Sequence, residues 1–367
     1  MTAWQTLLAL VGSAMSAACL ILIVTSDSVP PAVLTGFAAA GALSIVRFRF
    51  DAIAVDFVLT GLGAIALMLA LADGLVQPLY FWCALLAWWA FAWLLVERLA
   101  QAMRQGRFQG GLPSLLVPII FGVTLLVMWE AVVQGFKINH VFLPPPSAIW
   151  DRLTDPETVP LLWKDFQQTF LKGVLSGFAF GTLAGLAVAI LVDRSPFLKR
   201  GILPIGNFAS ALPIVGIAPI MVMWFGFDWQ SKAAVILCVT FFPMLINTLA
   251  GLNSAGRMEG DMMRTYASSY WQTLFKLRLP AAMPFIFNAL KINSTLALIA
   301  AIVAEFFGSP IVGMGFRIST GVGRLDVEMV WAEVAVAAVA GSASYGLIAL
   351  IERAVTFWHP SVRGGRA

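Results

Sequence analysis

The chain has 367 residues, of which 60% are hydrophobic and only 11% are charged. Soluble domains carry about 25% charged residues, so this composition indicates a protein whose main solvent is lipid. The net charge of +4 comes from basic residues that stand singly between apolar runs, which excludes the clustered basic stripe of a nucleic-acid binder.

Ten segments are apolar enough to cross a bilayer as helices. A hydrocarbon core of about 30 Å needs about 20 apolar residues, because backbone groups in lipid must bond within the helix. In chain order the segments are residues 4–24, 31–46, 53–72, 76–96, 112–133, 170–192, 202–223, 233–252, 284–306 and 330–351. The second segment is short and the seventh is broken by prolines. The sequence predicts an all-α polytopic membrane protein with about ten transmembrane helices.

Lysine and arginine are distributed unevenly between alternate loops. If both termini are cytoplasmic, the inner loops and tail hold fifteen of these residues and the outer loops hold seven, with Lys291 inside a span. Cytoplasmic loops of membrane proteins carry the excess of Lys and Arg. We therefore expect an even number of spans, cytoplasmic termini and a cytoplasmic loop over residues 257–280.

A polar, basic and glycine-rich stretch over residues 97–113 is typical of a linker between two membrane units. We expect residues 1–110 to form an extra four-helix membrane region and residues 111–367 to form a six-helix core. No repeat of fixed period is visible, which argues against a transporter built from two similar halves within this chain.

The sixth predicted span contains four glycines, each four residues after the one before it. They are Gly173, Gly177, Gly181 and Gly185. Glycines at this spacing share one helix face, and such a face lets a second helix backbone come close. The pattern predicts a structural packing face.

Prolines mark the seventh predicted span, which contains Pro204, Pro213 and Pro219. Its backbone must be locally irregular, because proline lacks the amide proton. Irregular backbone at membrane depth occurs where it is buried in protein or lines a water-filled cavity. Two interpretations stay open, a helix that lines a pathway and a helix that is merely kinked.

The inner loop over residues 253–284 is the most informative segment. Between Met258 and Phe275 its pattern predicts an amphipathic helix, too polar to span the bilayer and too apolar for a free linker. Pro280 and Pro284 then stop or kink any helix. Two interpretations stay open: a helix that passes a push from a partner protein into the membrane, and an interfacial helix that lies on the lipid headgroups.

At this loop the chain resembles the inner-membrane permeases of binding-protein-dependent transport systems. Their cytoplasmic signature is EAA, three residues, Gly, nine residues and Ile-x-Leu-Pro. The same register here gives Asp261-Met262-Met263, then Ala267, then Leu277-Arg278-Leu279-Pro280. Aspartate replaces the glutamate, methionines replace both alanines, and alanine replaces the glycine.

The resemblance implies that the loop helix inserts in a groove of a separate ATPase subunit, with the small residue allowing close approach. The implied coupling residues are Asp261, Met262, Met263, Arg264, Thr265, Tyr266, Ala267, Ser269, Leu279 and Pro280. Alanine is the smallest substitute for glycine, so we expect docking to survive. The larger methionines indicate a partner groove particular to this system.

Four further segments resemble the permeases for nitrate, taurine, alkanesulfonates and thiamine or pyrimidine precursors. They are residues 142–153, 211–232, 241–251 and 304–315. The resemblance extends from about residue 140 to 355, and the first 110 residues have no counterpart in the typical six-span member. It implies an ATP-binding cassette importer permease of the cell inner membrane that forms the pathway for a small solute. The implied partners are a second copy of the chain, two ATPase subunits, a substrate-binding protein and membrane lipid.

Polar groups in otherwise apolar spans are candidate pathway or gate residues, because unpaired polar groups are costly in lipid. The candidates are Asn247, Asn293, Thr295 and Glu305, together with Pro213, Met221, Met223 and Trp224 of the irregular span. Asn247 and Thr295 serve equally well as interhelical hydrogen-bonding groups. The resemblance aligns Glu305 with an acidic residue near the outer gate, and a gating and a pairing role stay open. The methionines and the tryptophan form either a soft apolar gate or ordinary core.

The sequence has no glycine-rich phosphate loop of the G-x-x-x-x-G-K-[ST] type. We therefore expect ATP and Mg²⁺ on the partner ATPase, and neither an enzyme activity nor a cofactor on this chain. Its three cysteines lack paired spacing and its two histidines lie far apart, so no metal site is predicted. The alternative function is an ion-coupled secondary transporter, which would want inverted repeats and paired carboxylates in mid-membrane.

Overall fold

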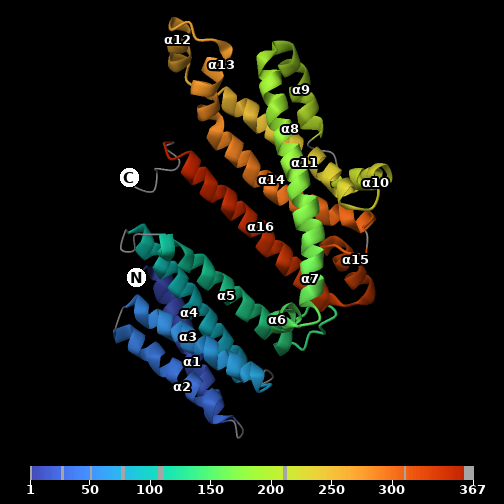
Figure 1. Ribbon diagram of the computed structural model, residues 1–367. Coiled ribbons are helices and arrows are strands. Elements are labelled where there is room, and N and C mark those ends of the chain that lie inside the picture. The colour runs from blue at the N-terminus through green and yellow to red at the C-terminus, as the bar shows by residue number, and fades with distance from the viewer. Residues whose placement is uncertain are drawn as a thin grey trace. The chain divides into compact units, whose positions relative to one another are not determined.

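The computed structural model describes residues 2–25, 29–49, 52–75, 79–105, 111–209, 213–309 and 311–358, and every regular element in these ranges is a helix (Figure 1). The chain forms two compact units, Met1–Ile149 and Trp150–Ala367. The expected division at residue 110 concerns an added region and a family core, and it stays a prediction.

Within the described residues, eight helices are long and apolar enough to cross a membrane. They coincide with eight of the ten predicted segments. The two less secure segments contain the shorter apolar helices Pro31–Val46 and Ile214–Phe225. The prediction of an all-α polytopic membrane protein is confirmed.

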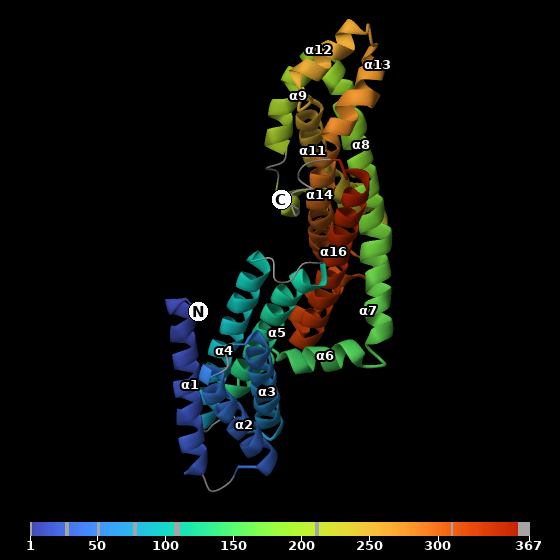
Figure 2. The same ribbon diagram turned by 90° about the vertical axis from the view of Figure 1, so that its left-hand side faces the viewer.

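The first unit is a bundle in which each helix packs on a neighbour in sequence and α1 also packs on α4 (Figure 2). Its helices are α1 (Ala3–Val24), α2 (Pro31–Arg49), α3 (Ile53–Ala72), α4 (Leu79–Arg104) and α5 (Gly111–Gly135). Trp88 of α4 lies in its centre and is only 3% exposed. The indole Nε1 donates to the Thr60 carbonyl oxygen at 2.9 Å, and Gly63 leaves room for the ring, since a Cβ there would lie 2.8 Å from it. This buried ring therefore fixes α4 against α3 with its polar atom satisfied.

A buried ion pair also joins α3 and α4. Asp56 is fully buried and accepts a hydrogen bond from Arg98, whose side chain is 10% exposed. Near one end of the same bundle, Gln5 donates to Gln101 at 2.8 Å. Charge in an apolar bundle is tolerated when it is paired, so these contacts account for Asp56, Arg98, Gln5 and Gln101.

The second unit is built around α11, which packs between α8 and α14 (Figure 1). The helix α6 (Pro146–Thr154) crosses from the first unit into this one. The others are α7 (Val159–Phe166), the π-helix η1 (Gln167–Val174), α8 (Leu175–Arg194), α9 (Pro196–Ala209), α10 (Ile214–Phe225), α11 (Trp229–Leu252), α12 (Arg257–Thr265), α13 (Tyr270–Thr273), the π-helix η2 (Leu274–Arg278), α14 (Leu279–Phe307), α15 (Met314–Arg324) and α16 (Val327–Val355). α7, η1 and α8 follow one another without a break.

The glycine face of α8 lies directly on α11. A Cβ at Gly177 would come within 2.6 Å of the Ile236 Cβ, and one at Gly185 would come within 2.6 Å of the Phe241 carbonyl oxygen. Real Cβ atoms do not approach this closely, so any larger residue would force the two helices apart. The predicted packing face is confirmed.

The seventh predicted span is two helices and not one. α9 ends at Ala209, residues 210–212 lie outside the described residues, and α10 begins after Pro213, which is extended with ψ of 123°. Pro204 and Pro219 lie inside α9 and α10. This break agrees with the prediction that prolines interrupt the span and make its backbone irregular, and a pathway-lining role for it stays a prediction. α10 has only 12 residues, about 18 Å of helix, which is shorter than the bilayer core.

Candidate functional site

The signature loop begins with α12, an isolated helix that buries none of its nine residues. Its N-cap, Gly256, offers no side-chain hydrogen bond, and Glu259 places a carboxylate in the first turn, where it complements the helix dipole. Asp261 and Arg264 form an ion pair at 3.5 Å whose side chains are 72% and 87% exposed. Such an exposed pair contributes little to stability.

α12 ends in a tight reversal at Ala267. The Ser268 amide donates to the Met263 carbonyl oxygen at 3.0 Å and the Ala267 amide donates to that of Arg264 at 2.9 Å. Ala267 itself has φ of 52°. This is the Schellman arrangement, in which a left-handed residue just past the helix satisfies its last carbonyl groups.

A second helix starts immediately after the reversal. The Ser269 hydroxyl accepts from the Gln272 amide at 3.3 Å, and the Gln272 side chain accepts from the Ser269 amide at 2.8 Å. This reciprocal capping box starts α13. The expectation of one amphipathic helix from Met258 to Phe275 is therefore wrong, because Ala267 stops the first helix and Ser269 starts the second.

The left-handed backbone gives a direct reason for the glycine that the family signature has at the position of Ala267. A left-handed conformation costs an L-residue about 1–2 kcal/mol, whereas glycine adopts it freely. The resemblance implied close approach to a partner at Ala267, and that role stays a prediction. The structure adds that the residue makes the turn and is exposed.

One exposed stripe of α12 is apolar, beside exposed charged residues such as Asp261 and Arg264. Met258, Met262 and Tyr266 follow one another at intervals of four and are 83%, 53% and 77% exposed. Residues at this spacing share one side of a helix. Methionine side chains adapt to irregular partner surfaces, so this face suits protein contact. Met263 and Thr265 flank it, and the Thr265 hydroxyl donates to the Asp261 carbonyl oxygen at 3.0 Å.

Of the predicted stop or kink at the base of the loop, the structure excludes the stop. Pro280 is the second residue of α14 and follows η2 directly, and Pro284 lies inside the same helix. Leu279 packs against the buried cluster around Leu274. η2 precedes α14, so the helical path is continuous from Tyr270 to Phe307.

Glu305, near the other end of α14, is only 2% exposed and is fully engaged. The Thr169 hydroxyl donates to it at 2.8 Å and the Gly315 amide donates at 2.7 Å. Thr169 lies in η1 and its hydroxyl accepts from the Met314 amide at 2.8 Å. Glu305 therefore ties α14 to η1 and to the start of α15.

Two more buried charges lie in the same region. Asp165 is fully buried and accepts from the Gly313 amide at 2.6 Å and from the Arg317 Nε at 2.7 Å. Lys232 is 2% exposed and donates to the carbonyl oxygens of Phe227 at 2.6 Å and Gly308 at 2.5 Å. We call Asp165, Thr169, Lys232, Glu305 and Arg317 the buried charge cluster. It connects α7, η1, α11, α14 and α15.

The sequence reasoning missed most of this cluster. Lys232 falls between the predicted spans 202–223 and 233–252, and thus in a predicted outer loop, but the structure places it in the first turn of α11 and buries it. Asp165 precedes the predicted sixth span and gave no signal of burial. Its partner Arg317 follows 152 residues later, and a pairing at that separation leaves no local pattern.

The remaining pathway candidates lie on three helices. On α11, Asn247 donates to the Pro243 carbonyl oxygen of its own helix at 2.8 Å. On α14, the buried Asn293 donates across to the Thr240 carbonyl oxygen of α11 at 2.8 Å, while Thr295 is exposed and bonds within its helix. This bond joins α14 to α11. Pathway roles for Asn247, Asn293 and Thr295 stay predictions.

The other candidates from the irregular span belong to α10 and its N-cap, Pro213. Met221 packs against the core of the second unit, whereas Met223 and Trp224 are 75% and 66% exposed. The packing of Met221 fits the core interpretation, and its role as a gate residue stays a prediction. Met223 and Trp224 present an apolar surface, and their role as a gate stays a prediction.

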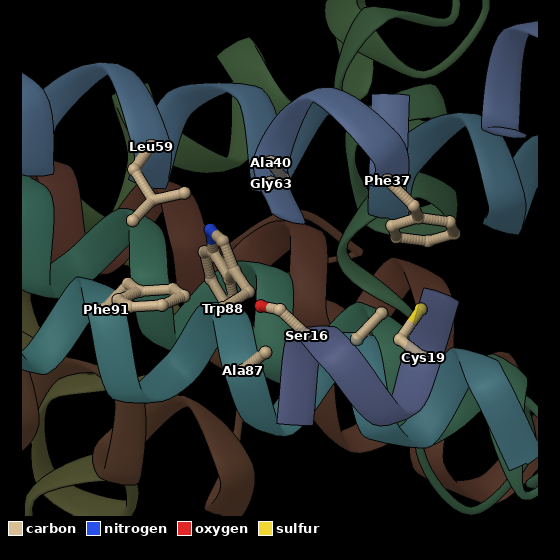
Figure 3. A pocket seen from close by; sticks show the side chains of 10 residues that line it. Ser16, Cys19, Phe37, Ala40, Leu59, Gly63, Ala87, Trp88 and Phe91 are labelled. Carbon is tan, nitrogen blue, oxygen red and sulfur yellow. The ribbon is translucent and has the colours of Figure 1, made fainter. Parts of the chain in front are cut away.

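The first unit contains a cavity of about 20 Å³ beside Trp88 (Figure 3). Ser16, Cys19, Phe37 and Phe91 are among its lining residues. A single water molecule needs about 10–15 Å³ measured in this way. The cavity is therefore too small for a solute and amounts to a packing gap.

Comparison with known proteins addresses the signature loop directly. A family described as binding-protein-dependent transport system inner membrane component matches residues 177–357, which include the chain from most of α8 to the end of α16. A probable ABC transporter permease protein of Haemophilus influenzae is 32% identical over 59% of this chain and 87% of its own length.

Two further relatives carry named transport systems. A riboflavin transport system permease protein of Chloroflexus aurantiacus is 29% identical over 68% of this chain and 92% of its own length. A taurine transport system permease protein of Escherichia coli is 31% identical over 65% of this chain and 88% of its own length. These similarities confirm the resemblance: the chain belongs to the family of binding-protein-dependent transport system inner membrane components, as a multi-pass ABC transporter permease.

Proposed function

We propose that two copies of this chain form the translocation pathway of an ATP-driven importer for a small solute in the cell inner membrane. In this proposal both termini are cytoplasmic, two separate ATPase subunits dock on the signature loops, and a substrate-binding protein delivers the solute from outside. ATP and Mg²⁺ belong to the ATPase subunits, and this chain holds no cofactor.

The observation that carries the proposal is the exposed α12. An apolar helix face with Met258, Met262 and Tyr266 standing free in the second unit has no packing role of its own. A contiguous exposed apolar patch on an otherwise folded unit marks a protein or membrane contact. The family of inner membrane components matches this chain over residues 177–357, which include the same loop, and this favours the protein contact over the lipid surface.

The substrate class follows only coarsely. The relatives named above belong to riboflavin and taurine transport systems, and these solutes share small size and little else. We therefore propose a small organic or anionic solute.

Native mass measurement of the detergent-purified assembly tests the proposal. The chain is produced together with its candidate ATPase subunit, and the expected mass corresponds to two copies of each. A complex with one copy of this chain would contradict the homodimeric pathway. An assembly that never retains an ATPase would contradict the role of α12.

A further inference from the structure

Arg278, the last residue of η2, donates hydrogen bonds to three acceptor oxygens on two other helices. Its Nη1 and Nη2 donate to the two carboxylate oxygens of Asp193 at 2.7 Å and 2.8 Å. Its Nε donates to the carbonyl oxygen of Leu252 at 2.9 Å. Asp193 lies near the end of α8 and Leu252 is the last residue of α11. One guanidinium therefore joins the ends of α8 and α11 to the start of α14.

The surroundings hold this guanidinium in place. The Asp193 side chain is 3% exposed and that of Arg278 is 22% exposed. The Tyr270 hydroxyl also donates to Asp193 at 3.2 Å, and the Arg194 guanidinium lies 5.7 Å from the Tyr270 ring centroid. Bidentate, charge-assisted bonds are roughly twice as strong as neutral ones and fix direction as well as distance.

The position of this group along the chain matters as much as its strength. The signature loop leaves the membrane helices at Leu252 and returns to them at Arg278, and the bond between these two residues closes the loop at its base. α12 and α13 lie together beyond the same end of α14 (Figures 1 and 2). α12 buries no residue, so a displacement of α12 reaches the membrane helices mainly through this base.

Leu274 makes the base stiff on its apolar side. It is fully buried in a cluster with Leu252, Ala282 and Ile286. The polar contacts of Arg278 and the apolar contacts of Leu274 thus clamp the same turn of η2 from two sides. A turn held in this way moves with α8, α11 and α14 as one body.

We propose that Arg278 and Asp193 are positioning residues that transmit the movement of the docked loop to the membrane helices. This inference rests on the proposed function. It concerns transmission after docking and not docking itself, because neither residue lies on the exposed face of α12.

The test measures transmission separately from docking. In the full-length chain, with its three native cysteines replaced by alanine, one cysteine is placed at Thr295 or, in a second chain, at Asn247. The complex with the ATPase is purified, and the rate of labelling by N-ethylmaleimide is compared without nucleotide and with ATP and orthovanadate. Retention of the ATPase and the melting temperature are measured on the same samples.

We call the contact between Arg278 and Asp193 the joint. Three variants probe it and a fourth serves as a control. Arg278→Lys keeps the charge but cannot reach three acceptors, Arg278→Gln removes the charge, and Asp193→Asn removes the carboxylate. Arg152→Lys is the matched control, because Arg152 also donates to both carboxylate oxygens of an aspartate, Asp326, at 3.0 Å and 3.1 Å. That pair lies at α6 and the start of α16, remote from the loop in sequence.

The joint variants should retain the ATPase and lose the nucleotide-dependent change in labelling, whereas Arg152→Lys should keep both. Joint variants that respond to nucleotide like the parent would overturn the inference alone. Loss of ATPase retention in Arg278→Lys would also overturn it, since the residue would then serve docking. A parent chain that retains no ATPase, or responds at neither cysteine, would sink the proposed function and this inference with it.

Discussion

The two ends of α14 are built in different ways, although one helix supplies both. Near Glu305, five polar side chains from five elements form the buried charge cluster. Near Leu279, the signature loop carries α12, which buries no residue, and is tied to the membrane helices at its base. The 29 residues of α14 make about 43 Å of helix between these regions.

This difference follows from what burial costs. A charge taken out of water must be paired and hydrogen-bonded, so a buried cluster permits one arrangement and holds its helices to it. An exposed helix pays no such cost and stays free to meet a partner. One end of the second unit is therefore built to hold its shape and the other to be contacted.

The largest expected effect is the loss of a buried partner in the charge cluster. Asp165→Ala leaves the Gly313 amide and the Arg317 guanidinium without their acceptor. Breaking a buried pair costs about 3–5 kcal/mol, and because Arg317 is 22% exposed we expect about 3 kcal/mol. Thermal unfolding in detergent measures the change.

The half-exposed pair of Arg152 and Asp326 is the comparison for that experiment, since its side chains are 36% and 39% exposed. Asp326→Asn keeps an oxygen to cap α16 and should cost about 0–1 kcal/mol. Equal losses for Asp165→Ala and Asp326→Asn would contradict the distinction between a buried and an exposed pair.

The next effect concerns the reversal at Ala267. Ala267→Gly should stabilise the loop by about 1 kcal/mol, because glycine adopts a positive φ without strain. Ala267→Trp keeps the strain, adds bulk beside the exposed face of α12 and should abolish ATPase retention while the spans insert normally. Pull-down of the ATPase from membranes measures retention, and hydrogen exchange of the loop amides measures its stability. Retention of the ATPase by Ala267→Trp would show that this turn does not meet the partner.

A smaller effect is expected at Glu333 of α16, which is fully buried with both carboxylate oxygens lacking a donor. It lies beside the Asp165 carboxylate. Glu333→Gln keeps the shape and supplies amide protons to that neighbour, so stability should stay within about 1 kcal/mol of the parent or rise. Melting temperatures of Glu333→Gln and of the shape-matched Glu305→Gln separate the two sites. Glu305 already has donors, so its variant should be the less stable one.

Spans and packing faces could be predicted from the sequence, because they repeat over many residues. The glycines of α8 and the eight long helices are examples. The signature loop could be located from the spacing between Asp261 and Pro280. What that spacing did not show was the break at Ala267, since alanine gives no sign of a left-handed backbone.

Pairings between distant residues could not be predicted for a different reason. Arg278 and Asp193 lie 85 residues apart, and the sequence around either residue does not indicate that the other is its partner. The count of basic residues by loop also treated Lys232 as solvent-exposed, although the fold places its ammonium against two carbonyl oxygens. Local pattern therefore predicts elements, whereas the contacts that carry charge depend on the packed structure.

The smallest expected effect is a dependence on pH at Asp228, the N-cap of α11, which lies outside the spans. Its carboxylate accepts from the Gln168 side chain at 2.7 Å and from the Trp229 amide at 2.8 Å, and these bonds, the Gln168 bond foremost, hold the pKa of Asp228 below its ordinary value. A carboxyl group whose pKa is lowered by folding stabilises the folded state at pH values above its pKa in the unfolded chain, about 3.9. This stabilisation is lost as the pH falls through its pKa in the folded state. Gln168→Leu should therefore lower the melting temperature at pH 7, and the difference in melting temperature from the parent should become smaller below about pH 4. Gln101→Leu is the control, because Gln101 bonds to the neutral Gln5. The difference in melting temperature between Gln101→Leu and the parent should stay constant with pH. If the difference for Gln168→Leu also stays constant, Asp228 stabilises this end of α11 without its charge.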